Sequence, residues 1–163
     1  MNTRKKFFTL IIIAIGIWLG SLLYWESRTV LRIANYKSGE IYVEVPAKEG
    51  DKLFFGWIHS WEKIPWNEYY HIAHDNTLVL DTITFPAFGA GIPENKGKVC
   101  RIENGLIYMD EINQVFPEFD WINSHFSTRE IILNGQLISK GDRLPEHTRL
   151  RLFVERRWKK WIK

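Results

Sequence analysis

Cysteine and recognisable catalytic motifs are what this sequence lacks. Cys100 is the single cysteine among 163 residues, so no disulfide can form within the chain and cysteine usage leaves the redox compartment open. Because Cys100 follows Val99 in a strand-like run, we expect it to be a buried structural thiol. The sequence contains no G-x-S-x-G, H-E-x-x-H, P-loop or dinucleotide-binding fingerprint. We therefore expect no catalytic residues and no cofactor, and enzymatic activity is kept as an alternative.

An excess of charge of one sign is also lacking. The formal net charge is +3, and much of it comes from basic residues at the two ends of the chain: Arg4, Lys5, Lys6, Arg156, Arg157, Lys159, Lys160 and Lys163. Nucleic-acid binding needs a clustered basic face on the folded domain, which a near-neutral middle does not supply. We expect no nucleic-acid partner, and the terminal basic residues suit the headgroups of membrane lipids.

One long apolar run occupies the N-terminus. Phe7 to Trp25 carry no charge and follow a basic cluster at residues 4–6. As a helix at ~1.5 Å per residue the run would extend about 28 Å, close to the ~30 Å hydrocarbon core of a bilayer. A cleaved secretory signal has a shorter apolar region and a small-x-small cleavage site, which the sequence LLYWESR does not offer. The run is therefore interpreted as an uncleaved anchor, and the positive-inside rule places residues 1–6 in the cytoplasm.

The remaining residues, 26–163, are predicted to form an extracytoplasmic β domain. Short runs of β-branched and aromatic residues with alternating polarity are separated by Gly, Pro, Asn and Asp, which is typical of strands. This pattern predicts a mainly β fold, an antiparallel β-sandwich or partly open barrel. The candidate strands are Leu31–Asn35, Ile41–Val45, Leu53–Ser60, Glu68–Ala73, Thr77–Phe85, Lys98–Glu103, Leu106–Ile112, Arg129–Asn134, Gln136–Ser139 and Arg149–Glu155.

Three connections carry further local signals. The dipeptides Asn104-Gly105 and Asn134-Gly135 predict two β-hairpins, because type I′ turns need positive φ at both central residues. The segment 113–125 is predicted to contain a short helix. The basic and aromatic end of the chain, residues 156–163, either lies against the bilayer or extends a strand as a solvated tail.

Polar and aromatic residues concentrate between residues 59 and 71, where a strand, a proline-containing loop and a returning strand are expected. Alternation places Trp57 with His59 on one face of the first strand, and Tyr69 with His71 on one face of its partner, so that these side chains can converge. Ser60 follows His59 directly and points to the opposite face, which disfavours a Ser–His catalytic dyad.

Two interpretations of this cluster remain open. His59, Glu68 and His71, with His74 in reserve, are ligand types that suit zinc, although their spacing matches no established metal motif. The interpretation we favour is a polar network in which His59 and Glu68 satisfy one another and backbone groups of the loop. We therefore expect no bound metal.

A second segment, Phe85 to Pro93, places Gly89 and Gly91 on either side of one alanine. Such a loop can turn tightly or cradle an anion, and it can equally be a plain strand connection. Together, His-Ser-x-Glu-Lys-x-Pro-Trp-x-Glu from His59 to Glu68 and Phe-Gly-Ala-Gly-x-Pro from Phe88 to Pro93 resemble the domain of unknown function 1850 family.

This resemblance implies a role in solute uptake. Members of the family are small extracytoplasmic proteins associated with tripartite ATP-independent periplasmic (TRAP) transporters of the TAXI type. It therefore predicts a single-pass protein of the cytoplasmic membrane that docks on the transporter's membrane subunit or solute-binding protein. The alternative is a domain that binds a small ligand or a metal. The predicted interaction or ligand surface comprises His59, Ser60, Glu62, Lys63, Pro65, Trp66, Glu68, His71, Phe88, Gly89, Gly91 and Pro93.

Overall fold

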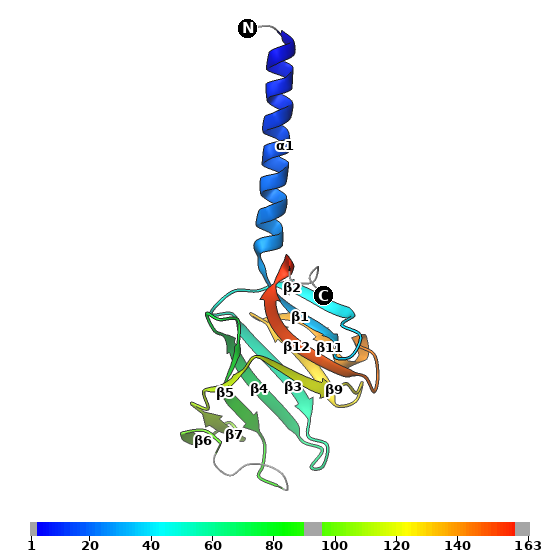
Figure 1. Ribbon diagram of the computed structural model, residues 1–163. Coiled ribbons are helices and arrows are strands. Elements are labelled where there is room, and N and C mark those ends of the chain that lie inside the picture. The colour runs from blue at the N-terminus through cyan, green and yellow to red at the C-terminus, as the bar shows by residue number, and fades with distance from the viewer. Residues whose placement is uncertain (1–2, 90–95, 159–163) are drawn as a thin grey trace. The chain divides into compact units, whose positions relative to one another are not determined.

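The N-terminal helix is the only α-helix in the part of the chain that the structure describes, residues 3–89 and 96–158 of a computed structural model (Figure 1). Helix α1 spans Thr3–Ser27. Its segment Phe7–Trp25 has a mean hydropathy of 2.3 and none of it is buried. The helix is thus long and apolar enough to span a membrane or to act as a signal anchor, as its composition predicted.

Aromatic and basic residues meet just after the membrane segment. The Arg28 guanidinium lies 5.6 Å from the ring centroid of Tyr24. The Arg157 guanidinium lies 4.3 Å from the ring centroid of Trp25, and the Arg157 backbone N–H donates to the Arg28 carbonyl at 2.9 Å. These cation–π contacts suit the interfacial position that tryptophan and tyrosine favour in membrane proteins. Residues 159–163, the rest of the basic terminus, lie outside the described residues.

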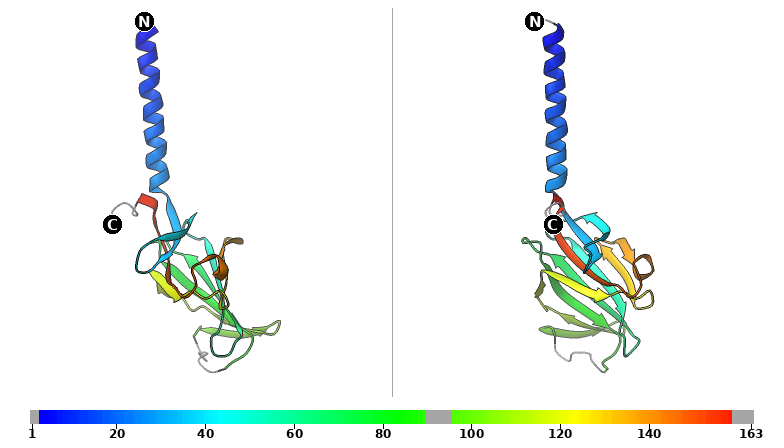
Figure 2. Two further views of the ribbon diagram at one scale, coloured as in Figure 1. Left: turned by 90° about the vertical axis from the view of Figure 1, so that its right-hand side faces the viewer. Right: turned by 45° about the vertical axis from the view of Figure 1, so that its right-hand side comes forward.

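Two β-sheets form the second unit, Val30–Glu155 (Figures 1 and 2). The smaller sheet has the order β2-β1-β12-β9, and the larger has the order β11-β10-β3-β4-β5-β7-β6, with β8 paired to β5. The neighbours whose residue pairing is resolved are antiparallel. The strands are β1 Thr29–Asn35, β2 Ile41–Pro46, β3 Lys52–Ile58, β4 Pro65–Ile72, β5 Leu78–Phe85, β6 Val99–Glu103, β7 Leu106–Asp110, β8 Gln114–Phe116, β9 Glu118–Ile122, β10 Thr128–Leu133, β11 Gln136–Lys140 and β12 Arg149–Arg156, with a 3-10 turn η1 at Gly141–Arg143.

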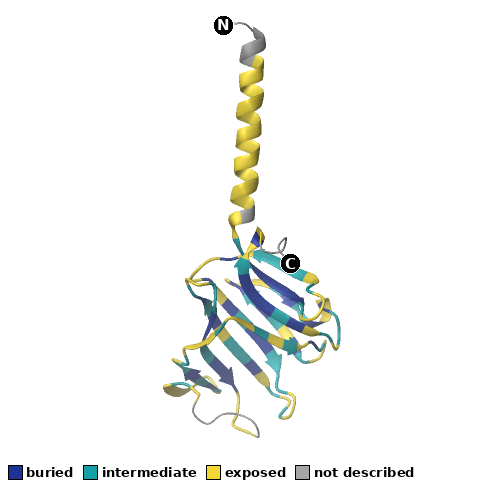
Figure 3. Ribbon diagram, viewed as in Figure 1, coloured by how far each residue is buried: buried dark blue, intermediate teal, exposed yellow. Residues whose placement is uncertain are grey.

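The hydrophobic core is built from buried residues of both sheets, and Figure 3 colours the buried residues of the strands dark blue. Leu150, Leu152 and Val154 of β12 supply the inner face of the smaller sheet. Ile83 and Phe85 of β5 are among the fully buried residues of the larger sheet. The predicted mainly β, antiparallel fold is therefore confirmed, and its unclosed sheets make it a sandwich.

Both Asn-Gly hairpins are confirmed. Asn104 and Gly105 have φ angles of 51° and 77°, and they join β6 to β7. Asn134 and Gly135 have φ angles of 48° and 78°, and they join β10 to β11. These values lie in the left-handed region that asparagine and glycine tolerate best.

The predicted helix within residues 113–125 is wrong. The segment instead forms β8 and β9 on either side of Pro117. Phe119 and Trp121 stand two positions apart on one face of β9 and pack against the aromatic core, while β9 hydrogen-bonds to β12. The hydrogen bonds to β12 and the burial of Phe119 and Trp121 outweigh any local helical preference of this segment. The sequence signal for a strand was the spacing of two residues between these aromatic side chains.

The prediction of a buried Cys100 is also wrong. Cys100 is exposed, as are all residues of β6. Strand β6 is the outermost strand of the larger sheet and pairs with β7 on one side. An apolar neighbour such as Val99 does not bury a residue when the strand lies at the edge of a sheet and no second layer covers it.

Candidate functional site

The β3–β4 hairpin carries most of the predicted surface. Trp57 faces Trp66 across the two strands, and Phe55 faces Glu68, so these four side chains share the inner face of the larger sheet. The connection is closed by two backbone hydrogen bonds, from His59 N to Ile64 O at 2.8 Å and from Lys63 N to His59 O at 2.9 Å.

The residues of the motif that form this connection, Ser60 and Lys63 among them, do not converge on one point. Ser60 is exposed in the turn, and Lys63 adopts a left-handed φ of 57°. Pro65 is exposed at the first position of β4. Strand β4 therefore starts three residues before the predicted Glu68, which brings Trp66 into the sheet.

Glu68 is the polar centre of the inner face. Its Oε1 accepts hydrogen bonds from Trp66 Nε1 at 3.0 Å and from Trp57 Nε1 at 3.4 Å. Its Oε2 accepts a 2.5 Å hydrogen bond from the Tyr70 hydroxyl. Burial of Tyr70, followed by the charge of Glu68 and this hydrogen bond, raises the pKa of the phenol well above its usual range. Tyr70 therefore remains a protonated donor, and the carboxylate is held by three uncharged groups.

His59 does not satisfy Glu68, contrary to the polar pair that we favoured from the sequence. Its ring centroid lies 5.7 Å from that of Trp57 and 5.8 Å from that of Trp66. Its Nδ1 accepts a 3.3 Å hydrogen bond from the Glu62 backbone N–H, which fixes the start of the turn. The indole groups of Trp57 and Trp66 reach Glu68 because alternation places all three side chains on the same face of the sheet. The His59 ring instead packs at a tilt against the two indole rings.

His71 lies on the opposite face of the sheet from Glu68, three positions along the same strand. Its Nδ1 is 2.8 Å from Asp81 Oδ2 on β5. His59, Glu68 and His71 are therefore not brought together as metal ligands. Among the residues that the structure describes, no three His, Cys, Asp or Glu side chains are arranged to hold a metal ion.

The second motif segment touches the first. A Cβ added to Gly89 would lie 2.6 Å from Glu62 Cδ, so the glycine lets the two loops approach closely. Phe88 is 52% exposed and packs edge-on against Phe85, with ring centroids 5.6 Å apart. Gly91 and Pro93 lie outside the described residues.

A cavity of about 360 Å³ opens beside Glu68, between the inner face of β3–β4 and strand β9. Its walls include the side chains of Phe55, Trp57, Phe119 and Trp121, together with Glu68. The Phe55 centroid lies 5.2 Å from Phe119 and 5.1 Å from Trp121, so the aromatic wall is continuous across the two sheets. The cavity extends from buried Phe55 to exposed Ser60 and Ile122.

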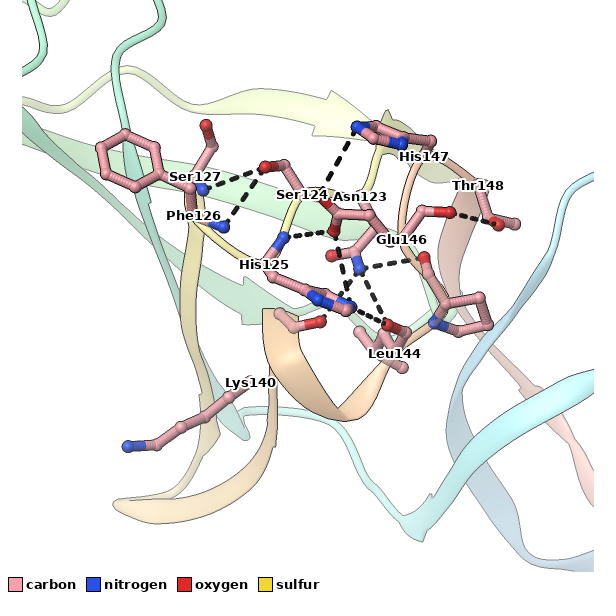
Figure 4. Close-up of polar contacts among 12 residues, drawn as sticks. Asn123, Ser124, His125, Phe126, Ser127, Lys140, Leu144, Glu146, His147 and Thr148 are labelled. Atoms are coloured by element: carbon pink, nitrogen blue, oxygen red, sulfur yellow. Dashed lines mark hydrogen bonds and ion pairs between the residues drawn. The ribbon is translucent and has the colours of Figure 1, made fainter.

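A network around Asn123 holds the β9 wall in place (Figure 4). The Asn123 side-chain amide donates to the carbonyls of Gly141, Leu144 and Pro145 at 3.0–3.2 Å. Its backbone N–H donates to Thr148 O at 2.9 Å. Since Asn123 is fully buried, this network ties the end of β9 to the segment before β12 and fixes Ser124, which also lines the cavity.

A larger concavity, about 660 Å³, lies on the outer face of the same sheet. Its charged side chains largely pair with one another: Arg101 donates to Asp110 at 2.7 Å, and Lys52 lies 3.9 Å from Asp81. The inner cavity differs because its described lining contains no lysine, arginine or histidine beside Glu68. The inner cavity therefore differs from the outer concavity in containing a carboxylate, that of Glu68, with no positively charged residue beside it in the lining.

Sequence reasoning found Trp66 and Glu68 but missed Trp57, Tyr70 and the two aromatic residues of β9 as partners in this site. The alternation Trp66, Glu68, Tyr70 was visible and places all three on one face. The β9 wall was hidden because that segment was predicted to contain a helix.

The fold and its aromatic interior define a small antiparallel β-sandwich domain that follows an anchor-like helix. The chain belongs to the family described as a domain of unknown function, DUF1850, whose model matches residues 54–139, just over half of the sequence. That span contains both motif segments and runs from within β3 to within β11. No curated protein and no solved structure matches the chain.

Proposed function

We propose that this protein is a membrane-anchored extracytoplasmic accessory module of a TAXI-type TRAP solute transporter. It docks on the transporter's membrane subunit or solute-binding protein. Membership of the DUF1850 family supports the association through the resemblance described above. The apolar helix supports attachment to the cytoplasmic membrane, and the basic cluster at residues 4–6 supports a cytoplasmic N-terminus.

The observation that carries the docking role is exposed aromatic surface on two loops that contact each other. Trp61 in the β3–β4 connection is 77% exposed, and Phe88 after β5 is 52% exposed. Tryptophan and other aromatic residues contribute much of the energy of protein–protein interfaces. The close approach of Gly89 to Glu62 joins these loops into one candidate docking surface.

Anchoring makes a weak docking surface effective. A domain confined beside its partner in the membrane meets it at a high effective concentration, so a small contact area suffices. The domain then docks as a positioning element, and its loops, rather than a catalytic group, carry specificity.

The test is a crosslinked pull-down of the tagged full-length protein from its native membrane, with partners identified by mass spectrometry. The double variant Trp61→Ala, Phe88→Ala removes two rings that are each more than half exposed and should lose a transporter subunit that the wild type captures. Ile102→Ala is the matched control, because Ile102 is 74% exposed and lies on strand β6, outside both loops.

Capture of a transporter subunit by the wild type and the control, but not by the double variant, supports the proposal. Failure of the wild type to capture any transporter subunit contradicts the accessory role. Equal capture by all three forms contradicts the assignment of the docking surface.

A further inference from the structure

We propose that the cavity beside Glu68 binds a small organic cation carrying an ammonium or quaternary ammonium group. The cavity reaches Ser60 in the β3–β4 connection, but its lining includes neither Trp61 nor Phe88, and its occupancy does not depend on the transporter association. The inference follows from the charge, the wall and the dimensions of the cavity.

The first observation is the negative charge of Glu68, which has no positively charged partner in the cavity lining. Glu68 is partly buried, and moving a carboxylate even partly out of water is costly unless it is paired or neutralised. Glu68 is hydrogen-bonded by Trp57, Trp66 and Tyr70, which orient it but bring no positive charge. The nearby acid Asp120 differs, because its carboxylate accepts a 2.7 Å hydrogen bond from Arg149 Nε. A cation inside the cavity would complete the pairing of Glu68.

The wall determines what kind of cation fits. Phe55, Trp57, Phe119 and Trp121 present aromatic surface to the cavity. Aromatic faces attract ammonium groups through the ring quadrupole, and cages of such rings with an acid nearby recognise choline-like and methylated amines. A small metal ion would instead need several oxygen or nitrogen ligands, whereas the lining offers two carboxylates, Glu68 and Asp120, of which Asp120 is already paired with Arg149.

The dimensions limit the size of the ligand. About 360 Å³ lies near the lower end of the ~300–1,000 Å³ range of ligand pockets, so the cation is small. Four residues with hydroxyl groups, Ser60, Ser124, Ser127 and Thr128, also line the cavity. Such groups suit a hydroxyl on the same ligand. Ethanolamine and choline both combine an ammonium group with a hydroxyl.

The experiment is an NMR titration of the full-length protein in maltoside micelles, following the indole N–H resonances of Trp57, Trp66 and Trp121. The probes are choline, ethanolamine and 3,3-dimethyl-1-butanol, which is the uncharged isostere of choline. Saturable shifts are expected with at least one of the two cations, with binding at least about tenfold tighter than the isostere. No saturable shift with either cation, or equal binding of choline and its uncharged isostere, overturns the proposal.

Two variants sharpen the test. Glu68→Gln keeps the size of the side chain and removes its charge, so the cation affinity should fall at least about tenfold. Asp110→Asn removes a carboxylate that Arg101 pairs on the outer face of the same sheet, away from this cavity, and the affinity should stay unchanged. Undiminished cation binding by a folded Glu68→Gln overturns the proposal. If Glu68→Gln does not fold, the relative affinities of the wild type for choline and for its uncharged isostere still test the proposal.

A free amine and a lipid headgroup share this chemistry, so the source is tested separately. The same titration is run in nanodiscs of phosphatidylglycerol and in nanodiscs containing phosphatidylethanolamine. Loss of free-cation binding only with phosphatidylethanolamine assigns the cavity to a headgroup, whereas equal binding in both assigns it to a free amine. Both outcomes support a cation site, and neither bears on capture of the transporter through Trp61 and Phe88.

Discussion

Two residues of the β domain hold a charge away from bulk solvent in different ways: Arg32, which is fully buried, and Glu68, which is partly buried. Arg32 is fully buried, and its guanidinium donates to Glu44 at 2.8 Å and also to Glu155. Glu68 is held by uncharged indole and phenol donors alone. The first arrangement compensates charge within the fold, whereas the second leaves a carboxylate that a ligand can match. A charge that is already paired within the fold is therefore a candidate for a structural role, whereas a charge without an oppositely charged partner is a candidate for ligand binding.

Arg32→Met tests the structural role of the buried arrangement. Breaking a buried ion pair by removing one partner costs about 3–5 kcal/mol, because the remaining charges stay buried without compensation. We expect a loss of that order in the free energy of unfolding, measured by chemical denaturation. Arg101→Met is the matched control, since Arg101 also contacts two carboxylates but its side chain is 43% exposed.

The exposed control should cost about 0–1 kcal/mol. Equal losses for Arg32→Met and Arg101→Met would show that burial of Arg32 is not what makes its pairs important. Combining Arg32→Met with Glu44→Gln and Glu155→Gln should recover part of the loss, because no buried charge is then left unpaired.

Among the elements, the two Asn-Gly hairpins use the same turn with different support. Both asparagines adopt positive φ, but only Asn134 also caps the neighbouring strand among the contacts described. Its Oδ1 accepts a 2.9 Å hydrogen bond from Lys52 N, and its backbone N–H donates to Lys52 O at 2.8 Å. The β10–β11 hairpin is thus tied to β3, the strand that carries Trp57.

Asn134→Ala should therefore cost more than Asn104→Ala. Each change places alanine in a left-handed conformation at about 1–2 kcal/mol, and Asn134→Ala loses in addition a hydrogen bond of about 1 kcal/mol. Thermal unfolding of the two variants measures the difference. Equal shifts in the unfolding midpoint would mean that the contact with Lys52 contributes nothing to stability.

Across the whole molecule, the β domain contains a core of its own. The buried cluster runs from Leu31 to Val154, and helix α1 supplies none of its members. A chain of residues 26–163 should therefore fold without detergent, with cooperative unfolding and a near-UV circular dichroism spectrum like that of the full-length protein. Loss of cooperative unfolding in this shorter chain would show that the helix or the membrane is needed for the fold.

Much of the architecture could be predicted from local patterns in the sequence. Every one of the ten strands expected from alternation is present, and both Asn-Gly turns have the predicted backbone conformation. These features depend on neighbours along the chain, so a single sequence contains their signal. Strand β9 was missed because its hydrogen bonds to β12 and its packing on Phe55 join residues far apart in the sequence.

The sequence by itself determined the apolar N-terminal helix, the strand-rich domain and the two motif segments, because each depends on composition or short-range periodicity. Only the tertiary structure decided which side chains meet. It turned His71 to the face opposite Glu68, placed the indole groups of Trp57 and Trp66 on that carboxylate, and closed the cavity with β9. Strand register and the stacking of two sheets fix these neighbours, and both arise from long-range pairing and burial that no short segment encodes.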